Sequence, residues 1–259
     1  MNQFALITGA SKGIGRSIAI SLAKREFNLL LVARSAPELN ELKLELSNQY
    51  NVSVEVFALD LSVHGAAKRV TEWCTDNAFP VSVLVNNAGF GVWGKFESLP
   101  LDEQLNMLQL NVTALTELTY YMLPLLRQNQ QGYVLNVSST AAYQAVPTLA
   151  MYAASKSYVL SFSRAIRYEL KDSSISITCL SPGPVGTAFA ERAGLSAIND
   201  IAEKFNMDAN VVAEIAVKAM LNRKAEVIPG FTNIISAYAN RILPKALIER
   251  ITAGIYKIK

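Results

Sequence analysis

The sequence has very few of the side chains that hold metal ions or close disulfides. Its 259 residues include one histidine, His64, and two cysteines, Cys74 and Cys179, which lie far apart in apolar stretches. One histidine cannot anchor a metal site alone, and we expect His64 at the start of a surface helix. Distant cysteines in apolar surroundings are typical of reduced core residues, so we expect neither a disulfide nor a metal centre.

Charge and long apolar runs are also scarce. Charged residues make up 17% of the chain, and the net charge of +3 is too small and too scattered to indicate a nucleic-acid partner. No uncharged apolar run reaches the roughly 18 residues that a membrane-spanning helix needs, and Pro124 interrupts the nearest one, 118–126. The first apolar run begins within a few residues of Met1, which leaves no room for a signal peptide. We therefore expect a soluble cytoplasmic protein.

Apolar residues are abundant, at 51%, and their spacing alternates between two patterns. Short strand-like runs occur near residues 3–8, 27–33, 52–58, 81–85, 132–138, 174–180 and 225–228. Helical patterns occur near 13–25, 37–49, 63–77, 101–128, 150–171 and 208–222. Strands that alternate with helices predict parallel pairing through right-handed crossovers. We expect an α/β fold with a doubly wound parallel sheet of about seven strands between two helical layers, in a single domain over residues 1–259.

The longest helical pattern, 101–128, has the clearest apolar face. Its members at helical spacing are Leu101, Leu105, Leu108, Val112, Leu115, Leu118 and Met122. Such a stripe predicts one continuous amphipathic helix that packs on the sheet.

A glycine-rich turn follows the first predicted strand. Residues 4–8 (Phe-Ala-Leu-Ile-Thr) run directly into 9–15 (Gly-Ala-Ser-Lys-Gly-Ile-Gly), and an amphipathic stretch, 16–24, comes next. Strand, glycine turn and helix in this order are typical of dinucleotide-binding folds, where backbone N–H groups and a helix N-terminus face the pyrophosphate. The alternative is an ordinary strand-to-helix turn, which three glycines in seven residues make the weaker interpretation.

Tyr152 and Lys156 stand four residues apart within the helical pattern 150–171. Side chains at i and i+4 share one helix face, with Cβ atoms about 5–6 Å apart. An ammonium at that distance favours the phenolate form of a tyrosine, whose ordinary pKa is about 10. The pair is therefore a candidate acid–base unit, although taken alone it also fits a solvated helix face.

Together these segments resemble the classical short-chain dehydrogenases/reductases, which have a Rossmann-type fold. Thr8-Gly9-x-x-x-Gly13-Ile14-Gly15 is similar to the family's cofactor signature, and Asn86-Asn87-Ala88-Gly89 to its motif after the fourth strand. Asp60-Leu61 and the segment 182–187 (Pro-Gly-Pro-Val-Gly-Thr) are similar to its motifs after the third and sixth strands. The matches keep the family's order over about three-quarters of the chain.

The resemblance implies an oxidoreductase that transfers hydride between a nicotinamide and a carbonyl carbon. Its catalytic residues would be Asn111, Ser139, Tyr152 and Lys156. Tyr152 would be the acid or base, Lys156 would lower its pKa and bind the nicotinamide ribose, Ser139 would hold the substrate oxygen, and Asn111 a proton-relaying water. The alternative for Asn111 is to stabilise its own helix. Strand alternation points Ser138 away from Ser139, so we expect Ser138 to line the cofactor pocket or bond nearby backbone.

The same resemblance assigns the cofactor contacts. They are Gly9, Ser11, Lys12, Gly13, Ile14, Gly15, Arg34, Asp60, Leu61, Asn87, Ala88, Gly89, Tyr152, Lys156, Pro182, Gly183, Val185 and Thr187. Asp60 would accept from the adenine amino group. Asn87 has the additional possibility of tying neighbouring strands together.

The end of the second predicted strand indicates which nicotinamide cofactor binds. Related folds that bind NAD carry a carboxylate there, whereas this chain has Ala33 followed by Arg34, with Lys12 in the glycine turn. Two cations and no acid suit the 2′-phosphate of NADP. The prediction is therefore NADP, with solvated surface charges as the alternative.

Residues 188–207 are expected to form a loop and short helices over the active site. Apolar side chains in this segment or beside the motif at 86–89 are Phe90, Trp93, Phe189, Leu195, Ile198, Ile201 and Phe205. Apolar pocket mouths suit apolar ligands. A hydrophobic ketone or a 3-oxoacyl compound is the small-molecule substrate we expect.

The last segment, 231–259, is a basic amphipathic extension. Its apolar stripe consists of Ile234, Ile235, Tyr238, Ile242, Leu243, Leu247, Ile248, Ile251 and Ile255. Such a segment fits an anionic membrane surface, but packing across the substrate cleft or on a neighbouring subunit is the favoured interpretation. The family resemblance also implies a homodimer or homotetramer formed through 101–128 and 150–171.

Two other functional classes remain open. One is a catalytically silent NADP-binding sensor, and the other is a membrane-surface scaffold with this fold. The retention of all four predicted catalytic residues argues against the sensor, which has no need of them.

Overall fold

A seven-stranded parallel sheet forms the centre of the molecule. The computed structural model describes all residues except 1–2, 188, 190–192, 195–205, 241–242 and 256–259. The strands are β1 (Phe4–Thr8), β2 (Asn28–Ala33), β3 (Val54–Ala58), β4 (Val81–Asn86), β5 (Gly132–Val137), β6 (Ile175–Leu180) and β7 (Glu226–Val227). They pair in the order β3-β2-β1-β4-β5-β6-β7, and each pair is parallel. The predicted doubly wound sheet is confirmed.

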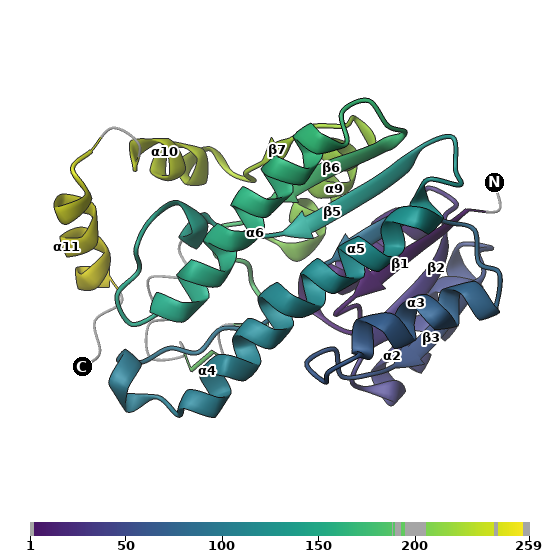
Figure 1. Ribbon diagram of the computed structural model, residues 1–259, viewed down its shortest axis with the longest axis horizontal. Coiled ribbons are helices and arrows are strands. Elements are labelled where there is room, and N and C mark those ends of the chain that lie inside the picture. The colour runs from purple at the N-terminus through teal and green to yellow at the C-terminus, as the bar shows by residue number, and fades with distance from the viewer. Residues whose placement is uncertain (1–2, 188, 190–192, 195–205, 241–242, 256–259) are drawn as a thin grey trace.

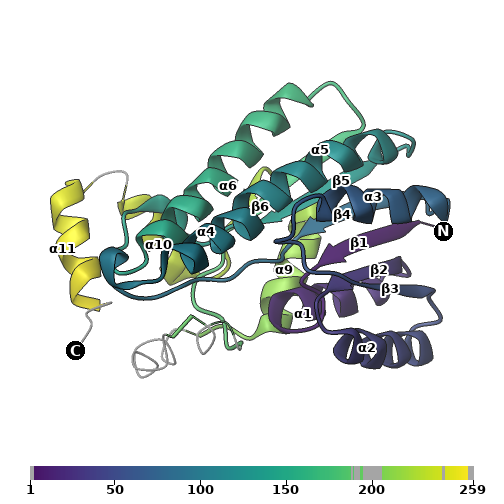
Figure 2. The same ribbon diagram turned by 60° about the horizontal axis from the view of Figure 1, so that its bottom comes forward.

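Helices cover both faces of this sheet (Figure 2). One layer contains α1 (Gly13–Ala23), α2 (Ala36–Gln49) and α9 (Ala209–Leu221); the other contains α3 (Ala66–Asp76), α5 (Leu115–Leu126) and α6 (Ala150–Glu169). Successive strand residues point to opposite layers: Leu29 and Leu31 pack with α1 and α9, whereas Leu30 and Val32 pack with α3 and α5. Because both faces are covered, the strands are apolar at most positions on both sides.

The predicted helix 101–128 is not continuous. α4 (Leu101–Leu108) passes into a π-helical segment, Gln109–Ala114, before α5 begins. A π segment changes the hydrogen-bond step from four residues to five and so shifts the helix face. Leu101 and Leu105 are accordingly 59% and 49% exposed, whereas Leu118 is buried. The prediction of one buried stripe was therefore wrong for the first two turns.

Two helices follow β7. α10 (Phe231–Ala239) and α11 (Lys245–Ile255) lie at the end of the molecule where the strands terminate, opposite the N-terminus (Figure 1). Register places Thr8 beside Val32 and Asn86 beside Asn136, so the carboxyl ends of the central strands meet at this edge. His64 lies exposed two residues before α3, just outside the helix predicted to begin there.

Candidate active site

The glycine turn is tied to the end of β4 by Thr8 and Asn87. The Thr8 hydroxyl accepts from the backbone N–H groups of Asn87 and Ala88, each at 3.0 Å. The Asn87 amide donates to the carbonyls of Thr8 and Gly9 at 2.9 and 3.1 Å. A Cβ on Gly15 would lie 2.3 Å from the Gly9 oxygen, so only glycine fits there without a shift. Asn87 therefore has the strand-tying role that its position suggested.

The loop after β6 closes over this turn. A Cβ on Gly13 would lie 3.1 Å from the Thr187 methyl group, so residue 187 sits directly against the glycine turn. The Pro182 carbonyl accepts from the Thr140 N–H at 2.9 Å, which joins the same loop to the segment after Ser139. The structure thus brings together three motifs that the sequence predicted separately.

The Asp60-Leu61 pair divides its two side chains between surface and core. One oxygen of Asp60 accepts from the backbone N–H and the hydroxyl of Ser62 at 2.9 and 2.7 Å. Leu61 is buried in the core beneath α3, so only its backbone can meet a ligand at this edge.

Both cations of the predicted 2′-phosphate corner, Lys12 in the glycine turn and Arg34 after β2, face carboxylates. The Lys12 ammonium lies 2.7 Å from Glu38, and the Arg34 guanidinium lies 3.9 Å from Asp60. The pKa of Glu38 is lowered, chiefly because Lys12 donates a hydrogen bond to it, with smaller contributions from Ser11 and Ser35. The expectation that this corner holds no acid was therefore wrong. Ser35 and Glu38 have the Ser-x-x-Glu spacing of a helix-start capping box, a signal that predicts a glutamate at this turn.

Tyr152 and Lys156 lie on the buried side of α6. The Lys156 ammonium is 5.8 Å from the centre of the Tyr152 ring and donates to the Val137 carbonyl at 3.0 Å. Burial lowers the pKa of Lys156 to about 8. Lysine has three donors, so two remain beside the one that Val137 accepts. The pair is therefore held in the interior, and the alternative of a solvated helix face is excluded.

The two serines after β5 differ as strand alternation predicted. Ser138 is buried, and its hydroxyl donates to the Lys156 carbonyl at 2.8 Å, so it supports the backbone of α6. Ser139 is half-buried, and its hydroxyl oxygen accepts from the Ala141 N–H at 3.1 Å at the start of the 3₁₀ turn Thr140–Tyr143. The Ser139 O–H is thus a donor presented at the carboxyl edge of the sheet.

Asn111 lies in the π segment and binds the backbone after the Asn-Asn-Ala-Gly motif. Its amide donates to the Phe90 carbonyl at 2.9 Å and to the Ser155 hydroxyl at 3.1 Å, while its oxygen accepts from the Phe90 N–H at 3.1 Å. A Cβ on Gly89 would lie 2.9 Å from that oxygen and 3.4 Å from the Lys156 ammonium. The side chain therefore fixes a neighbouring loop, and Ser155 is a partner that sequence reasoning missed.

An apolar wall covers the ring of Tyr152. The rings of Phe189 and Tyr152 lie 5.4 Å apart, and a Cβ on Gly91 would meet Phe189 at 3.1 Å and Tyr152 at 3.2 Å. Phe90 is buried in the same cluster, and Trp93 packs on it. The other predicted wall residues, Leu195, Ile198, Ile201 and Phe205, lie outside the described residues.

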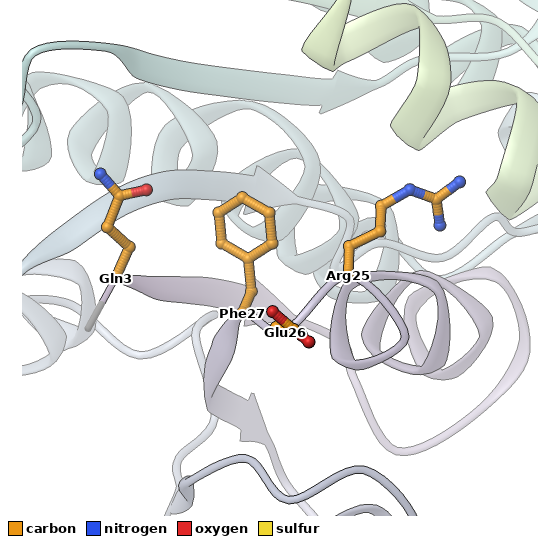
Figure 3. Close-up of a pocket in the computed structure, with 4 residues that line it drawn as sticks. All are labelled: Gln3, Arg25, Glu26 and Phe27. Atoms are coloured by element: carbon orange, nitrogen blue, oxygen red, sulfur yellow. The ribbon is translucent and has the colours of Figure 1, made fainter. Parts of the chain in front are cut away.

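The amino edge of the sheet, opposite the candidate site, has a small hollow whose arginine is paired with a glutamate. A hollow lined by Gln3, Arg25, Glu26 and Phe27 lies at the amino ends of β1 and β2 (Figure 3). Arg25 there is bound by Glu214 at 2.7 Å, so the hollow offers no unpaired charge for an anion. Within the described part of the chain, no cluster of metal-ligating side chains occurs, and no helix combines the length and hydropathy needed to cross a bilayer.

Comparison with known proteins identifies the family. The family model for short chain dehydrogenase matches residues 3–198. The chain belongs to the short-chain dehydrogenase family. It is thus an oxidoreductase of the kind that acts on hydroxyl and keto groups.

Individual relatives are similar over most of their length. The chain is 29% identical over 242 residues to 17β-hydroxysteroid dehydrogenase type 3 of Homo sapiens, covering 92% of this chain and 77% of that one. It is 35% identical over 187 residues to the NADP-dependent 3-hydroxy acid dehydrogenase of Schizosaccharomyces pombe, covering 71% and 72%. A short-chain dehydrogenase from Sphingobium yanoikuyae, solved in complex with NADPH, superposes with a TM-score of 0.82 at 27% identity and covers 99% and 96%.

Proposed function

We propose that the protein is an NADP(H)-dependent reductase of an apolar ketone or 3-oxoacyl compound, and that it also catalyses the reverse oxidation. The observation that carries this proposal is the convergence of Tyr152, Lys156 and Asn111 around the loop at Gly89, beside the glycine turn. Relatives named for a hydroxysteroid and a 3-hydroxy acid support the substrate class, since both are secondary alcohols formed from ketones.

The residues present fit a bound dinucleotide. Glycine at positions 9 and 15 lets the turn pack tightly, because a Cβ at either would meet Asn87 or Gly9 below 3.0 Å. α1 begins within this turn, so its N-terminal N–H groups would face a pyrophosphate bound there. Lys12 and Arg34 would bind the 2′-phosphate, and Thr187 and Val185 would hold the nicotinamide end. The relative solved with NADPH supports NADP as the cofactor.

When bound, NADPH supplies the hydride that adds to the substrate carbonyl carbon. The Ser139 hydroxyl donates to the carbonyl oxygen and stabilises the charge that develops there. The Tyr152 hydroxyl gives its proton to that oxygen, so the product is an alcohol and Tyr152 is left as phenolate. Lys156, in its charged form, stabilises the phenolate.

The proton is then restored from solvent. Both ends of the Asn111 side chain are engaged by Phe90 and Ser155. We therefore assign the proton-relaying water to the Asn111 backbone carbonyl rather than to its amide, with Lys156 next in the relay.

The test is NADPH oxidation with a panel of apolar ketones, comparing the wild type with Tyr152→Phe. Loss of the phenolic proton is expected to lower kcat by about 10²- to 10⁴-fold. Tyr158→Phe on the same helix, where the ring is 38% exposed, is the matched control and should retain activity. Equal activity in Tyr152→Phe and the wild type would refute the assignment.

We also propose a homodimer or homotetramer formed through the helices α4, α5 and α6. Exposed apolar rings on this side, Tyr120 and Tyr168, are each 72% exposed. The Tyr158 hydroxyl lies 3.0 Å from that of Thr116, which joins α5 to α6 at the same surface. Light scattering of the purified protein measures the assembly directly, and a monomer at all concentrations would exclude it.

A further inference from the structure

α10 exposes four large apolar side chains along one side, next to the exposed Thr232 and Ser236. Phe231, Ile234, Ile235 and Tyr238 are 76%, 37%, 53% and 51% exposed. Positions three and four apart share a helix face, so these four side chains form one stripe. The opposite side of the helix carries Asn233 and the buried Ala237, which face the body of the protein.

The next helix, α11, also exposes apolar side chains, and it adds cations. Leu247 and Ile251 are 43% and 53% exposed, whereas Ile248 and Thr252 on the other side are buried. Lys245 and Arg250 are exposed on the same helix, with one acid, Glu249, between them. Over residues 231–259 the sequence contains five Lys or Arg residues and one Glu.

This surface is joined to the loop of the active site. Asn233 lies so close to Gly183 that a Cβ there would be 2.3 Å from its amide oxygen, and it donates to the Pro229 carbonyl at 2.7 Å. α10 also packs against the 3₁₀ turn Thr140–Tyr143, which begins directly after Ser139. The apolar face and the catalytic edge therefore share one end of the molecule (Figure 1).

We infer that α10 and α11 form a surface that binds anionic lipid membranes. Apolar side chains that enter the acyl boundary, with lysine and arginine beside them, have the physical signature of a helix lying in a membrane interface. A second copy of this chain fits less well, because a two-fold contact pairs a patch with itself and brings like charges together. This inference rests on the proposed function: on a membrane, the surface would bring the end of the molecule that contains Tyr152 to apolar carbonyl compounds dissolved in the bilayer.

Sedimentation with vesicles tests this surface without using activity, so it can fail while the proposed function stands. The full-length protein should pellet with phosphatidylcholine vesicles containing phosphatidylglycerol and not with phosphatidylcholine alone. Lys245→Glu with Arg250→Glu should weaken binding by at least about 25-fold, because each basic residue near an anionic surface contributes about fivefold. Phe231→Ser with Ile235→Ser should weaken it by about tenfold or more.

Matched controls separate a specific surface from general charge and hydrophobicity. Lys68→Glu with Arg69→Glu reverses two exposed charges on α3, and Leu44→Ser removes a side chain that is 64% exposed on α2. Both controls should bind as the wild type does. Equal pelleting of all variants would overturn the inference. A second result would also overturn it: the wild type does not pellet with vesicles, and the α10 and α11 variants dissociate an oligomer in light scattering. That result would assign the face to contact with a second copy of this chain.

A second inference comes from the Lys12–Glu38 pair. Glu38 lies in the first turn of α2, where its carboxylate is 2.7 Å from the Lys12 ammonium. This is the corner at which we propose the 2′-phosphate of NADP binds. A carboxylate and a phosphate monoester both carry anionic oxygens that accept from the same donors. The geometry points to Glu38 as a specificity-determining residue that competes with the 2′-phosphate for Lys12.

Fluorescence titration with NADPH and with NADH tests this competition. Glu38→Gln should lower the Kd for NADPH by about two- to fivefold, the range expected from releasing an exposed ion pair. The Kd for NADH should not change, because NADH has the pyrophosphate but lacks the 2′-phosphate. Glu41→Gln, on the exposed side of the same helix, is the control and should leave both constants unchanged. An unchanged or higher Kd for NADPH in Glu38→Gln overturns the inference, whereas absence of NADPH binding in the wild type would instead refute the proposed cofactor.

Discussion

The glycine-turn region and the C-terminal helix pair differ in how completely the chain itself satisfies them. Around Thr8 and Gly15, donors meet acceptors within the protein, and backbone atoms approach so closely that a methyl group is excluded. In contrast, α10, α11 and the link between them expose large apolar side chains: Phe231, Ile234, Ile235, Tyr238, Leu243, Leu247 and Ile251. The first region is held by contacts within the protein, whereas the second exposes the apolar surface that we propose binds a membrane.

The largest expected difference between the two regions comes from replacing one glycine in each with alanine. Gly15→Ala places a Cβ 2.3 Å from the Gly9 oxygen, whereas Gly254→Ala in α11 meets nothing within 4 Å. We expect Gly15→Ala to lower the free energy of unfolding by about 3 kcal/mol, as overpacking does, and to abolish NADPH binding. Gly254→Ala should change it by no more than the roughly 1 kcal/mol gain that alanine brings to a helix. Urea denaturation measures the free energy of unfolding of both variants. Similar losses of stability in the two would contradict the difference between the regions.

Lys156 provides a pH test of how deeply the catalytic pair is buried. Its pKa is lowered from 10.5 to about 8 by burial, so the unfolded chain binds more protons than the folded one between these pH values. Stability due to this group therefore rises with pH from about 8 to 10.5 and is constant below 8. Relative to Lys156→Met, the wild type should gain roughly 3 kcal/mol over that window. Other titrating groups are common to both proteins and cancel in the difference. A difference that does not change with pH would show that Lys156 is solvated.

Asn111 tests whether the loop at Phe90 is fixed by a side chain. Asn111→Ala removes three buried hydrogen bonds, two to the Phe90 backbone and one to the Ser155 hydroxyl. We expect a loss of about 2 kcal/mol in urea denaturation, because these bonds are lost in the interior, and a lower kcat. Asn77→Ala, at an exposed helix end, is the control and should cost under about 0.5 kcal/mol. A neutral Asn111→Ala would assign the loop's position to other contacts.

Asn233 should give the smallest effect, since it ties α10 to the loops after β6 and β7 by few contacts. Removing its hydrogen bond to the Pro229 carbonyl by Asn233→Ala is expected to cost about 1 kcal/mol. Amide hydrogen exchange should show faster exchange in α10 and no change in β1. Protection lost equally in both segments would mean that the tail and the sheet unfold as one unit.

The sequence predicted the parts of the structure that depend on local patterns. All seven strands lie where apolar runs predicted them, and the glycine turn, Lys156 and Ser138 have the environments expected of them. These positions obey rules of backbone geometry and strand alternation, which a single sequence contains.

Features that depend on contacts between distant segments were not predictable. The π segment Gln109–Ala114 interrupts an apolar periodicity that continues through it, and within it the Asn111 amide donates to Phe90 and Ser155. The Glu38 contact with Lys12 joins α2 to the glycine turn across the end of β2. In each case the sequence contains both residues but does not show that they contact each other.

Isotope transfer tests the central claim most directly. With NADPH deuterated at the transferable position and an apolar ketone that the wild type reduces, mass spectrometry should find the deuterium on the carbinol carbon of the alcohol. Tyr152→Phe should bind NADPH as the wild type does and form almost none of this product. If the wild type binds NADPH but no ketone in the panel acquires deuterium, hydride transfer is contradicted. That result would favour a catalytically silent NADP-binding sensor.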